Sequence, residues 1–257
     1  MSKIFKRCVY FSAIAVFSLM LLLHNIGNTM AAYEEGDVSN GGTITGSVKF
    51  AGDVSDTKML EVTKDQKTCG ADPKPSEALL ISPDKNIKSA VVSITTISKG
   101  KKFDRSGGNP TVDQQGCVFI PHLTLVPAGG TIDLLNSDDV MHNLHSYSMK
   151  NTAFNEGVAG GGKLPKKFEY PETVKLKCDV HKWMDAWIIV QDNPYYAVTD
   201  ENGSFSIGDV PPGTYTVLVW QEKLGKDTKE ITVKAGEEVK VDFEMKAKKK
   251  RARRKKK

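Results

Sequence analysis

A thiol, an imidazole and a thioether lie close together in one short stretch of the chain. In VKLKCDVHKWMDAW, residues 174–187, Cys178, His181 and Met184 follow one another at intervals of three. These side chains suit copper that alternates between Cu(I) and Cu(II). Zinc more usually binds several thiolates, or a closed set of cysteine and histidine without methionine. The stretch therefore predicts a copper site.

The residues before the thiol alternate as in a β-strand. In TVKLKC, residues 173–178, apolar side chains alternate with polar ones. Because successive side chains of a strand point to opposite faces, Cys178 is expected to point inward at the end of a buried strand. The turn that follows would return His181 and Met184 toward the same point. A second histidine would complete a trigonal set of two histidines and one cysteine, with a weak axial methionine.

That second histidine is expected in NSDDVMHNLHS, residues 136–146. The stretch follows a strand-like segment and contains His142 and His145. Alternation from His142 gives His145 a different direction, so His142 is the favoured ligand.

Together, the two segments resemble the cupredoxins, small blue-copper electron carriers, and among them the amicyanin and plastocyanin type. The resemblance rests on Cys-x-x-His-x-x-Met, on MHNLH and on FIPHLTLVPAGGTIDLLNSDD, and it covers roughly 111–192. It implies that Asn143 ties the two ligand loops together through hydrogen bonds. It also implies that an exposed edge of His181 is the electron port. The implied ligands of one type 1 copper are His142, Cys178, His181 and Met184.

Each implied ligand also has a purely structural interpretation. Cys178 could be a buried thiol or a disulfide partner, and His181 a surface loop residue. Met184 could belong to the core, with a backbone oxygen in the axial position. The coincidence of all four residue types at matching spacings favours copper. Trp183 and Trp187 flank the loop; packing is their default role, and shielding the site or contacting an electron partner is the alternative.

The N-terminus has the pattern of an export signal. Lys3, Lys6 and Arg7 precede an uncharged run, 9–23, and then NTMAA. The run is at the upper limit for a signal peptide and short of the roughly 20 residues of a spanning helix. We expect a signal peptide, 1–31, with an uncleaved membrane anchor as the alternative. The protein would then be periplasmic, or lie in the cell envelope or outside the cell.

Export bears on the four cysteines. Cys8 lies within the signal, and three cysteines remain in an oxidising compartment, where free thiols tend to pair. A disulfide between Cys69 and Cys117 would leave Cys178 for the metal. Cys117 and His122, in GCVFIPH, also suggest a second metal site, but Cys69 offers Cys117 a disulfide partner.

The rest of the chain predicts an all-β protein built from sandwiches. Short alternating or β-branched runs are separated by Gly, Pro and Asn/Asp turns, and no substantial amphipathic helix is indicated. The stretch 148–165 is Gly-rich and reads as a loop. The expected strands are 43–50, 88–97, 117–126, 131–135, 173–178, 187–190, 204–207, 214–220, 229–233 and 238–245.

A second module is indicated after the copper segment. TDENGSFSIGDVPPGTYTV resembles carboxypeptidase regulatory-like, or transthyretin-like, β-sandwiches. The whole arrangement resembles bacterial methylamine-utilisation or plastocyanin-like proteins. The expected organisation is an N-terminal β segment 42–110, a Greek-key cupredoxin domain 111–192, the second sandwich 193–245 and a polybasic tail 246–257. Residues 42–110 either belong to the cupredoxin or complete the second sandwich, with the copper domain inserted; the sequence leaves both open.

Charge is unevenly distributed along the chain. The tail holds ten basic residues and no acid. The chain has 36 basic and 31 acidic residues, and the tail and the signal contain all but 23 of the basic ones. The segment between the signal and the tail therefore has a net charge of about −8. Such a tail could bind an anionic envelope surface or an acidic redox partner, or simply be a solvated extension. Outside the cytoplasm, nucleic acid is not an expected partner.

These features favour an exported copper protein that carries single electrons, rather than an enzyme. The expected partner is a redox protein such as a cytochrome or a dehydrogenase. A multicopper oxidase or reductase would need further histidine clusters, and the chain has five histidines. Covalent haem is excluded because Cys-x-x-Cys-His is absent. The alternatives are copper handling without electron transfer, and a structural or adhesive sandwich that binds no metal.

Overall fold

A computed structural model describes residues 33–247 of the chain. The predicted signal and the residues 248–257 of the basic tail lie outside this part. Within it the chain is almost entirely β-structure, with one short helix, α2 (Gln66–Cys69), so the predicted all-β fold class is confirmed. No helix in the described part is long and apolar enough to cross a membrane.

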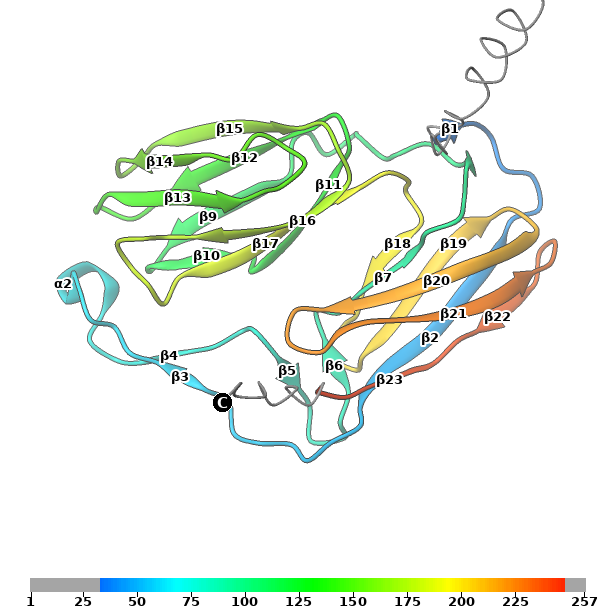
Figure 1. The fold of residues 1–257 in the computed structure, drawn as a ribbon, viewed down its shortest axis with the longest axis horizontal. Coiled ribbons are helices and arrows are strands. Elements are labelled where there is room, and N and C mark those ends of the chain that lie inside the picture. Colours follow the sequence, from blue (N-terminus) through cyan, green and yellow to red (C-terminus); the bar gives the residue numbers. More distant parts are fainter. Residues whose placement is uncertain (1–32, 248–257) are drawn as a thin grey trace, which may run out of the picture. The chain divides into compact units, whose positions relative to one another are not determined.

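Two sheets formed by residues 111–191 make the first sandwich (Figure 1). One sheet contains, in spatial order, β10 (Val118–Ile120), β9 (Thr111–Gln115), β12 (Gly130–Asn136) and β15 (Lys163–Phe168). The other contains β11 (Leu123–Pro127), β17 (Asp185–Gln191), β16 (Glu172–Lys177), β13 (His142–Tyr147) and β14 (Asn155–Val158). Most pairs are antiparallel, but β9 with β12 and β11 with β17 are parallel.

The core of the first sandwich is filled from both sheets. Phe119, Leu134 and Phe168 come from one sheet, and Leu144 and Leu176 from the other; none of the five is more than 2% exposed. Cys178 belongs to the same buried cluster. Residues on alternate positions of β16 are buried, as the sequence predicted. The rigid core therefore ends directly at the thiol.

The loop predicted over 148–165 is wrong. This stretch contains β14, which pairs with β13, and the start of β15, which pairs with β12. Both strands lie at the edge of a sheet and keep most side chains exposed. Val158 and Phe168, the last residues of the two strands, are buried, but the other side chains are exposed or half-buried, so the strands lack the apolar alternation that marks a strand in the sequence.

The second sandwich is built from both ends of the described chain. One sheet contains β18 (Tyr196–Val198), β7 (Val91–Ile94), β20 (Gly213–Gln221) and β21 (Gly225–Val233). The other contains β19 (Ser204–Val210), β2 (Gly42–Phe50) and β22 (Glu238–Lys240), with β23 (Phe243–Met245) also paired to β2. Ile44, Tyr195 and Phe243 lie at its core.

This pairing bears on the alternatives that the sequence left open. β2 pairs with β19, β22 and β23, and β7 pairs with β18 and β20. Strands from 42–100 therefore complete the second sandwich, and the first sandwich is inserted between β7 and β18. Assigning 42–192 wholly to one cupredoxin does not fit these pairings.

Residues 51–76, which we call the bridging segment, leave β2 and reach the first sandwich. The segment contains β3 (Met59–Leu60), α2 and β4 (Lys74–Pro75). Val62 and Cys69 are buried in the first core. The predicted disulfide between Cys69 and Cys117 is present, with an S–S distance of 2.01 Å. The chain then returns through β5 (Leu80–Ile81) and β6 (Ile87–Lys88), where Ile87 joins the second core.

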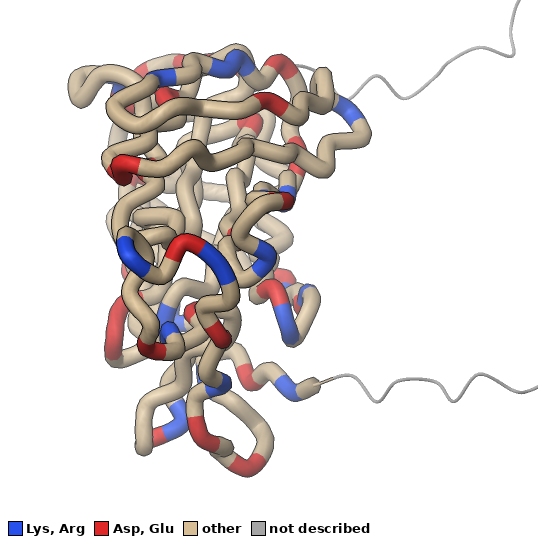
Figure 2. Tube along the Cα trace, turned by 90° about the vertical axis from the view of Figure 1, so that its left-hand side faces the viewer, with Lys and Arg blue, Asp and Glu red and all other residues tan. Residues whose placement is uncertain are grey.

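The remaining elements are small. β1 (Glu34–Glu35) pairs in parallel with β8 (Lys99–Gly100). Acidic and basic residues are interspersed along the described chain, as Figure 2 shows. A buried polar contact also links the loops of the two sandwiches: Nε2 of His122 lies 2.7 Å from Oε2 of Glu222, and Trp187 donates to the same oxygen.

Candidate metal centre

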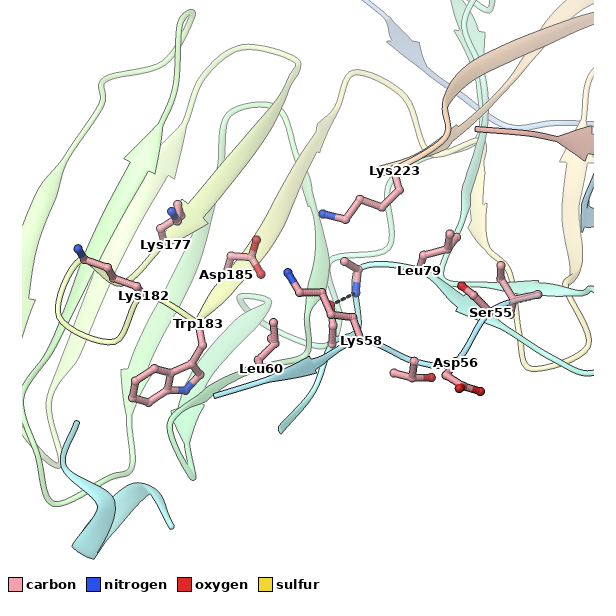
Figure 3. A pocket seen from close by; sticks show the side chains of 14 residues that line it. Ser55, Asp56, Lys58, Leu60, Leu79, Lys177, Lys182, Trp183, Asp185 and Lys223 are labelled. Atoms are coloured by element: carbon pink, nitrogen blue, oxygen red, sulfur yellow. Dashed lines mark hydrogen bonds between the residues drawn. The ribbon is translucent and has the colours of Figure 1, made fainter. Parts of the chain in front are cut away.

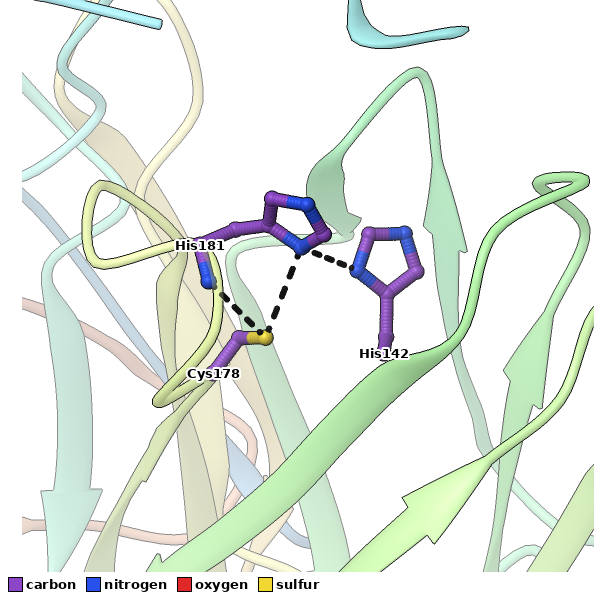
Figure 4. A group of neighbouring side chains, drawn as sticks. All are labelled: His142, Cys178 and His181. Atoms are coloured by element: carbon purple, nitrogen blue, oxygen red, sulfur yellow. Dashed lines mark hydrogen bonds between the residues drawn. The ribbon is translucent and has the colours of Figure 1, made fainter. Parts of the chain in front are cut away.

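Neighbouring strands of one sheet position the predicted ligands. Cys178 follows directly after β16, and His181 and Met184 lie in the turn between β16 and β17. His142 is the first residue of β13, which pairs with β16 through His145 and Lys177. Figure 4 shows the two imidazole rings and the thiol converging from these two elements.

The ligand atoms form a compact, buried group. One nitrogen each of His142 and His181 and the sulfur of Cys178 all lie within 4.8 Å of one another. All three residues have no exposed surface. Sγ of Cys178 lies 3.7 Å from Nδ1 of His181. Two nitrogens and one sulfur in a buried group are the donor set of a trigonal copper site.

The turn that carries the thiol is fixed by its own backbone. Cys178 N donates to the carbonyl of Met184 at 3.2 Å, and Met184 N donates to the carbonyl of His181 at 2.8 Å. The backbone N–H groups of His181 and Asn143 donate to Sγ of Cys178, at 3.4 and 3.5 Å. These two contacts hold the sulfur atom at the end of β16.

The two histidines face each other with the same ring nitrogen. Their Nδ1 atoms are 2.8 Å apart, while Nε2 of His142 lies 2.8 Å from Oδ2 of Asp138 and Nε2 of His181 lies 2.8 Å from Oδ2 of Asp65. A carboxylate only accepts hydrogen bonds, so each Nε2 carries a proton, and in a neutral ring the Nδ1 atom then presents its lone pair. Two such lone pairs at this distance repel unless a cation lies between them and the sulfur.

A proton is a poorer candidate for that cation than a metal ion. Burial is the main reason that the pKa of His142 lies below its ordinary value, and the nearby His181 lowers it further. A carboxylate behind each imidazole is also the usual arrangement at metal sites, because it fixes the tautomer and makes the ligand more basic. The residues present therefore fit a copper ion.

Asp138 is held firmly behind His142. Its carboxylate accepts hydrogen bonds from the backbone of Gly116 at 2.6 Å and of Cys117 at 2.8 Å, as well as from His142. The side chain of Asp138 is 7% exposed. Since Cys117 is tied to Cys69, the disulfide and the His142 ring share one rigid corner of the fold.

His181 differs from its expected setting. The resemblance predicted an exposed edge on this ring, and that prediction is wrong: His181 is fully buried. The bridging segment covers the ring, and Asp65 occupies its Nε2. Asp65 has a left-handed backbone, with φ of 48°, directly before α2. The sequence reasoning missed Asp65, because a single aspartate in a polar stretch carries no local signal.

Asn143 links the two ligand segments. Its Oδ1 accepts a hydrogen bond from the backbone N–H of Asp179 at 2.5 Å, and its amide nitrogen donates to Asn155. The Asp179 carboxylate also lies 2.9 Å from Nδ1 of His145. His145 is thus partly exposed and bonded away from the ligand group, consistent with the direction inferred from alternation.

Met184 lies in the core, and Trp183 packs against His181. Met184 is 1% exposed and belongs to the first core. Trp183 is 9% exposed, donates from Nε1 to the carbonyl of Cys117 at 2.9 Å, and meets the ring of His181 edge-on at 5.0 Å between centroids. The second metal site suggested by Cys117 and His122 does not form in the described residues, since Cys117 is in the disulfide and His122 contacts Glu222.

Comparisons with known proteins give one family match and several structural similarities. Residues 167–241 match the family described as polysaccharide lyase family 4, domain II. No curated protein sequence matches the chain. The resemblance of the second sandwich to carboxypeptidase regulatory-like domains stays a prediction.

Several solved copper-protein structures are similar to about a third of the chain. The Cu-containing nitrite reductase of Thermus scotoductus SA-01 is 21% identical over 32% of this chain and 22% of its own, with a TM-score of 0.31. The purple cupredoxin of Nitrosopumilus maritimus is 21% identical over 32% of this chain and all of its own, with a TM-score of 0.29. Amicyanin of Paracoccus versutus is 19% identical over 33% of this chain and 82% of its own, with a TM-score of 0.29. The chain thus spans about a fifth of the reductase.

Proposed function

We propose that this protein is an exported type 1 copper protein that carries single electrons between redox partners. The observation that supports this most is the buried convergence of two Nδ1 atoms and one Sγ atom, with a carboxylate behind each imidazole. The copper is held by His142, Cys178, His181 and, as a weak axial ligand, Met184.

Bound copper would supply a one-electron redox couple, and the protein supplies a fixed environment for it. Asp138 and Asp65 hold the two rings in one tautomer and one orientation. The Cys178 sulfur is held at the end of β16 by two backbone donors. The surrounding core excludes water. Because the ligands cannot move far, little reorganisation accompanies a change of oxidation state.

Burial also argues against a copper-handling role. A protein that passes copper to others needs a site that opens readily for ligand exchange. Here all three converging ligands are fully buried, and the bridging segment that covers His181 is tied down by a disulfide. Electron transfer needs no such opening, since an electron crosses protein without displacing ligands.

The first test is the visible absorption and electron paramagnetic resonance spectrum of the protein after addition of Cu(II). A type 1 site gives an intense thiolate-to-copper charge-transfer band and narrow hyperfine splitting. Replacing Cys178 with Ser should abolish the band, and His142→Ala should weaken copper binding. His145→Ala is the matched control, because His145 lies on the same strand and bonds away from the site.

Other outcomes would contradict the proposal in distinct ways. Copper uptake without the charge-transfer band would mean that Cys178 is not a ligand, and would favour copper handling. A folded protein that takes up no copper would favour a structural or adhesive sandwich. Partner and location belong to the same proposal: the partner is a redox protein outside the cytoplasm, and the basic tail contacts anionic envelope surfaces.

A further inference from the structure

The resemblance implied that a redox partner contacts an exposed edge of His181. In the structure this edge is covered, so the site lacks that contact surface. An electron must then pass through another group that touches a ligand and reaches the surface. Trp183 meets both conditions: its ring contacts that of His181 edge-on, and it lines a surface pocket. An aromatic ring in contact with a ligand is a short path from the centre to the surface.

The pocket beside Trp183 has a volume of about 400 Å³. The bridging segment forms one wall, and the stretch 177–185 around the ligand turn forms another (Figure 3). Four lysines line it: Lys58, Lys177, Lys182 and Lys223. Two acidic residues, Asp56 and Asp185, lie among them.

One of the two acidic residues in this pocket is already neutralised by a salt bridge. Asp185 pairs with Lys175, at 2.6 Å. Lys223 pairs with Glu222, at 3.1 Å. Within residues 33–247, Lys58, Lys177 and Lys182 form no salt bridge. Three unpaired lysines against one unpaired aspartate make the pocket locally positive, although the chain between signal and tail is acidic.

We infer that this lysine-lined pocket is the docking and electron-exchange site for the acidic surface of a redox protein partner. The inference rests on the proposed electron-transfer function. Carboxylates of the partner contact Lys58, Lys177 and Lys182, which places its redox group near Trp183. Such charge complementarity steers association and raises its rate, with a strong dependence on ionic strength.

The redox step in this pocket transfers one electron and nothing else. With copper bound, an anionic oxidant such as hexacyanoferrate(III) docked here would take one electron from Cu(I), which would give hexacyanoferrate(II) and Cu(II).

The first experiment measures binding alone, on the copper-free protein. Redox-inert hexacyanocobaltate(III) is titrated while the Trp183 indole and the Lys177 and Lys182 amide signals are followed by nuclear magnetic resonance. These signals should shift together, and added salt should suppress the shifts. In a variant with Lys177→Glu and Lys182→Glu, binding should weaken about tenfold or more, because two attractive charges become repulsive.

The control variant carries Lys49→Glu and Lys85→Glu. Both lysines are exposed, belong to the second sandwich part of the chain and form no salt bridge among the described residues. This variant has the same net charge as the pocket variant, so any effect of net charge alone on anion binding is the same in both. Equal loss of binding in both variants would mean that the anion responds to net charge only, and would overturn the inference.

The second experiment measures electron exchange in the copper-loaded protein. Hexacyanoferrate(III) should oxidise the pocket variant about tenfold more slowly than the control variant, while cationic hexaamminecobalt(III) should not be slowed. If both variants react equally with the anion, the pocket is not the exchange site. Absence of the charge-transfer band in the copper-loaded protein would reject the proposed function. Anion binding is measured on the copper-free protein and therefore tests the pocket independently of that function.

Discussion

The carboxylate of Asp65 lies 2.8 Å from Nε2 of His181, although the two residues are 116 positions apart. Asp65 belongs to the bridging segment, and His181 to the turn after β16. The contact therefore places a negative charge directly behind one proposed copper ligand, on an element that does not belong to the first sandwich.

We expect Asp65→Asn to raise the reduction potential of the centre. The aspartate stabilises Cu(II) more than Cu(I), and the asparagine has no charge. Because the Asp65 side chain is 47% exposed and therefore screened by water, the loss amounts to about 1 kcal/mol, or roughly 40 mV for a one-electron couple. Voltammetry of the copper-loaded protein measures it. Asp53→Asn, an exposed residue of the same segment, should leave the potential nearly unchanged; an equal shift there would exclude a specific effect of Asp65.

Met184→Leu should retain the charge-transfer band and raise the potential. The thiolate and both imidazoles remain, while a weak sulfur donor is lost, and the axial ligand tunes the potential of such sites. Met184 is 1% exposed, and this volume-conserving change should cost less than about 1.5 kcal/mol of stability. Spectroscopy and voltammetry on one sample provide the check. An unchanged potential would mean that Met184 is a core residue and that the axial position is filled otherwise.

Removing the disulfide should destabilise the protein substantially. The bond between Cys69 and Cys117 closes a loop with a sequence separation of 48. Loop-closure entropy alone predicts a loss of about 4 kcal/mol in unfolding free energy for a variant with Cys69→Ser and Cys117→Ser. Urea denaturation measures this, with reduced wild-type protein as the comparison. Cys178 should also react faster with thiol reagents in the copper-free variant, because the bridging segment is released; an unaltered rate would show that the cover holds without the bond.

The pair of His122 and Glu222 should make stability depend on pH. Burial opposes the charge on each residue, but their mutual hydrogen bond and attraction prevail: the pKa of His122 is raised and that of Glu222 lowered. The charged His122 contributes its full stabilisation at pH values below 6.5, the ordinary pKa of histidine. This stabilisation is lost as the pH rises through the raised pKa of His122. The charged Glu222 contributes its stabilisation at pH values above 4.5, the ordinary pKa of glutamate. This stabilisation is lost as the pH falls through the lowered pKa of Glu222.

Glu222→Gln should therefore lower the free energy of unfolding most strongly between pH 4.5 and 6.5. Breaking one partner of a buried pair costs about 3 kcal/mol. Thermal unfolding of both proteins across this range measures the difference. The exposed pair of Lys88 and Glu201 is the control, since Lys88→Gln should change stability by less than about 1 kcal/mol at every pH. A difference for Glu222→Gln that does not vary with pH would contradict the charged pair.

The parts of the site that could be predicted from the sequence are those encoded locally. The period of two in 173–178 places Cys178 at the end of a buried strand, and the three-residue spacing brings His181 back beside it. Alternation along 142–147 likewise separates His142 from His145. Each of these inferences needs only a few neighbouring residues.

The rest depends on contacts between distant segments. Asp65 faces His181 because a disulfide and a buried Val62 hold the bridging segment on the first sandwich. The burial of His181 follows from the same contacts, so no pattern around residue 181 reveals it. The edge strands β14 and β15 escape the sequence analysis for another reason: their backbones are paired, but apart from Val158 and Phe168 their side chains are exposed or half-buried and show no apolar period.

The insertion of the first sandwich also determines the order in which the protein can fold. Strands β9 to β17 are continuous in the chain, whereas β2 finds its partners only after β19, β22 and β23 have been synthesised. Until then, β2 and β7 lack their partners in the second sandwich, and their exposed backbone groups favour aggregation. Once the first sandwich has collapsed, its ends bring Ser93 next to Tyr196 and shorten the loop that must be closed. We therefore expect the first sandwich, once folded, to favour assembly of the second.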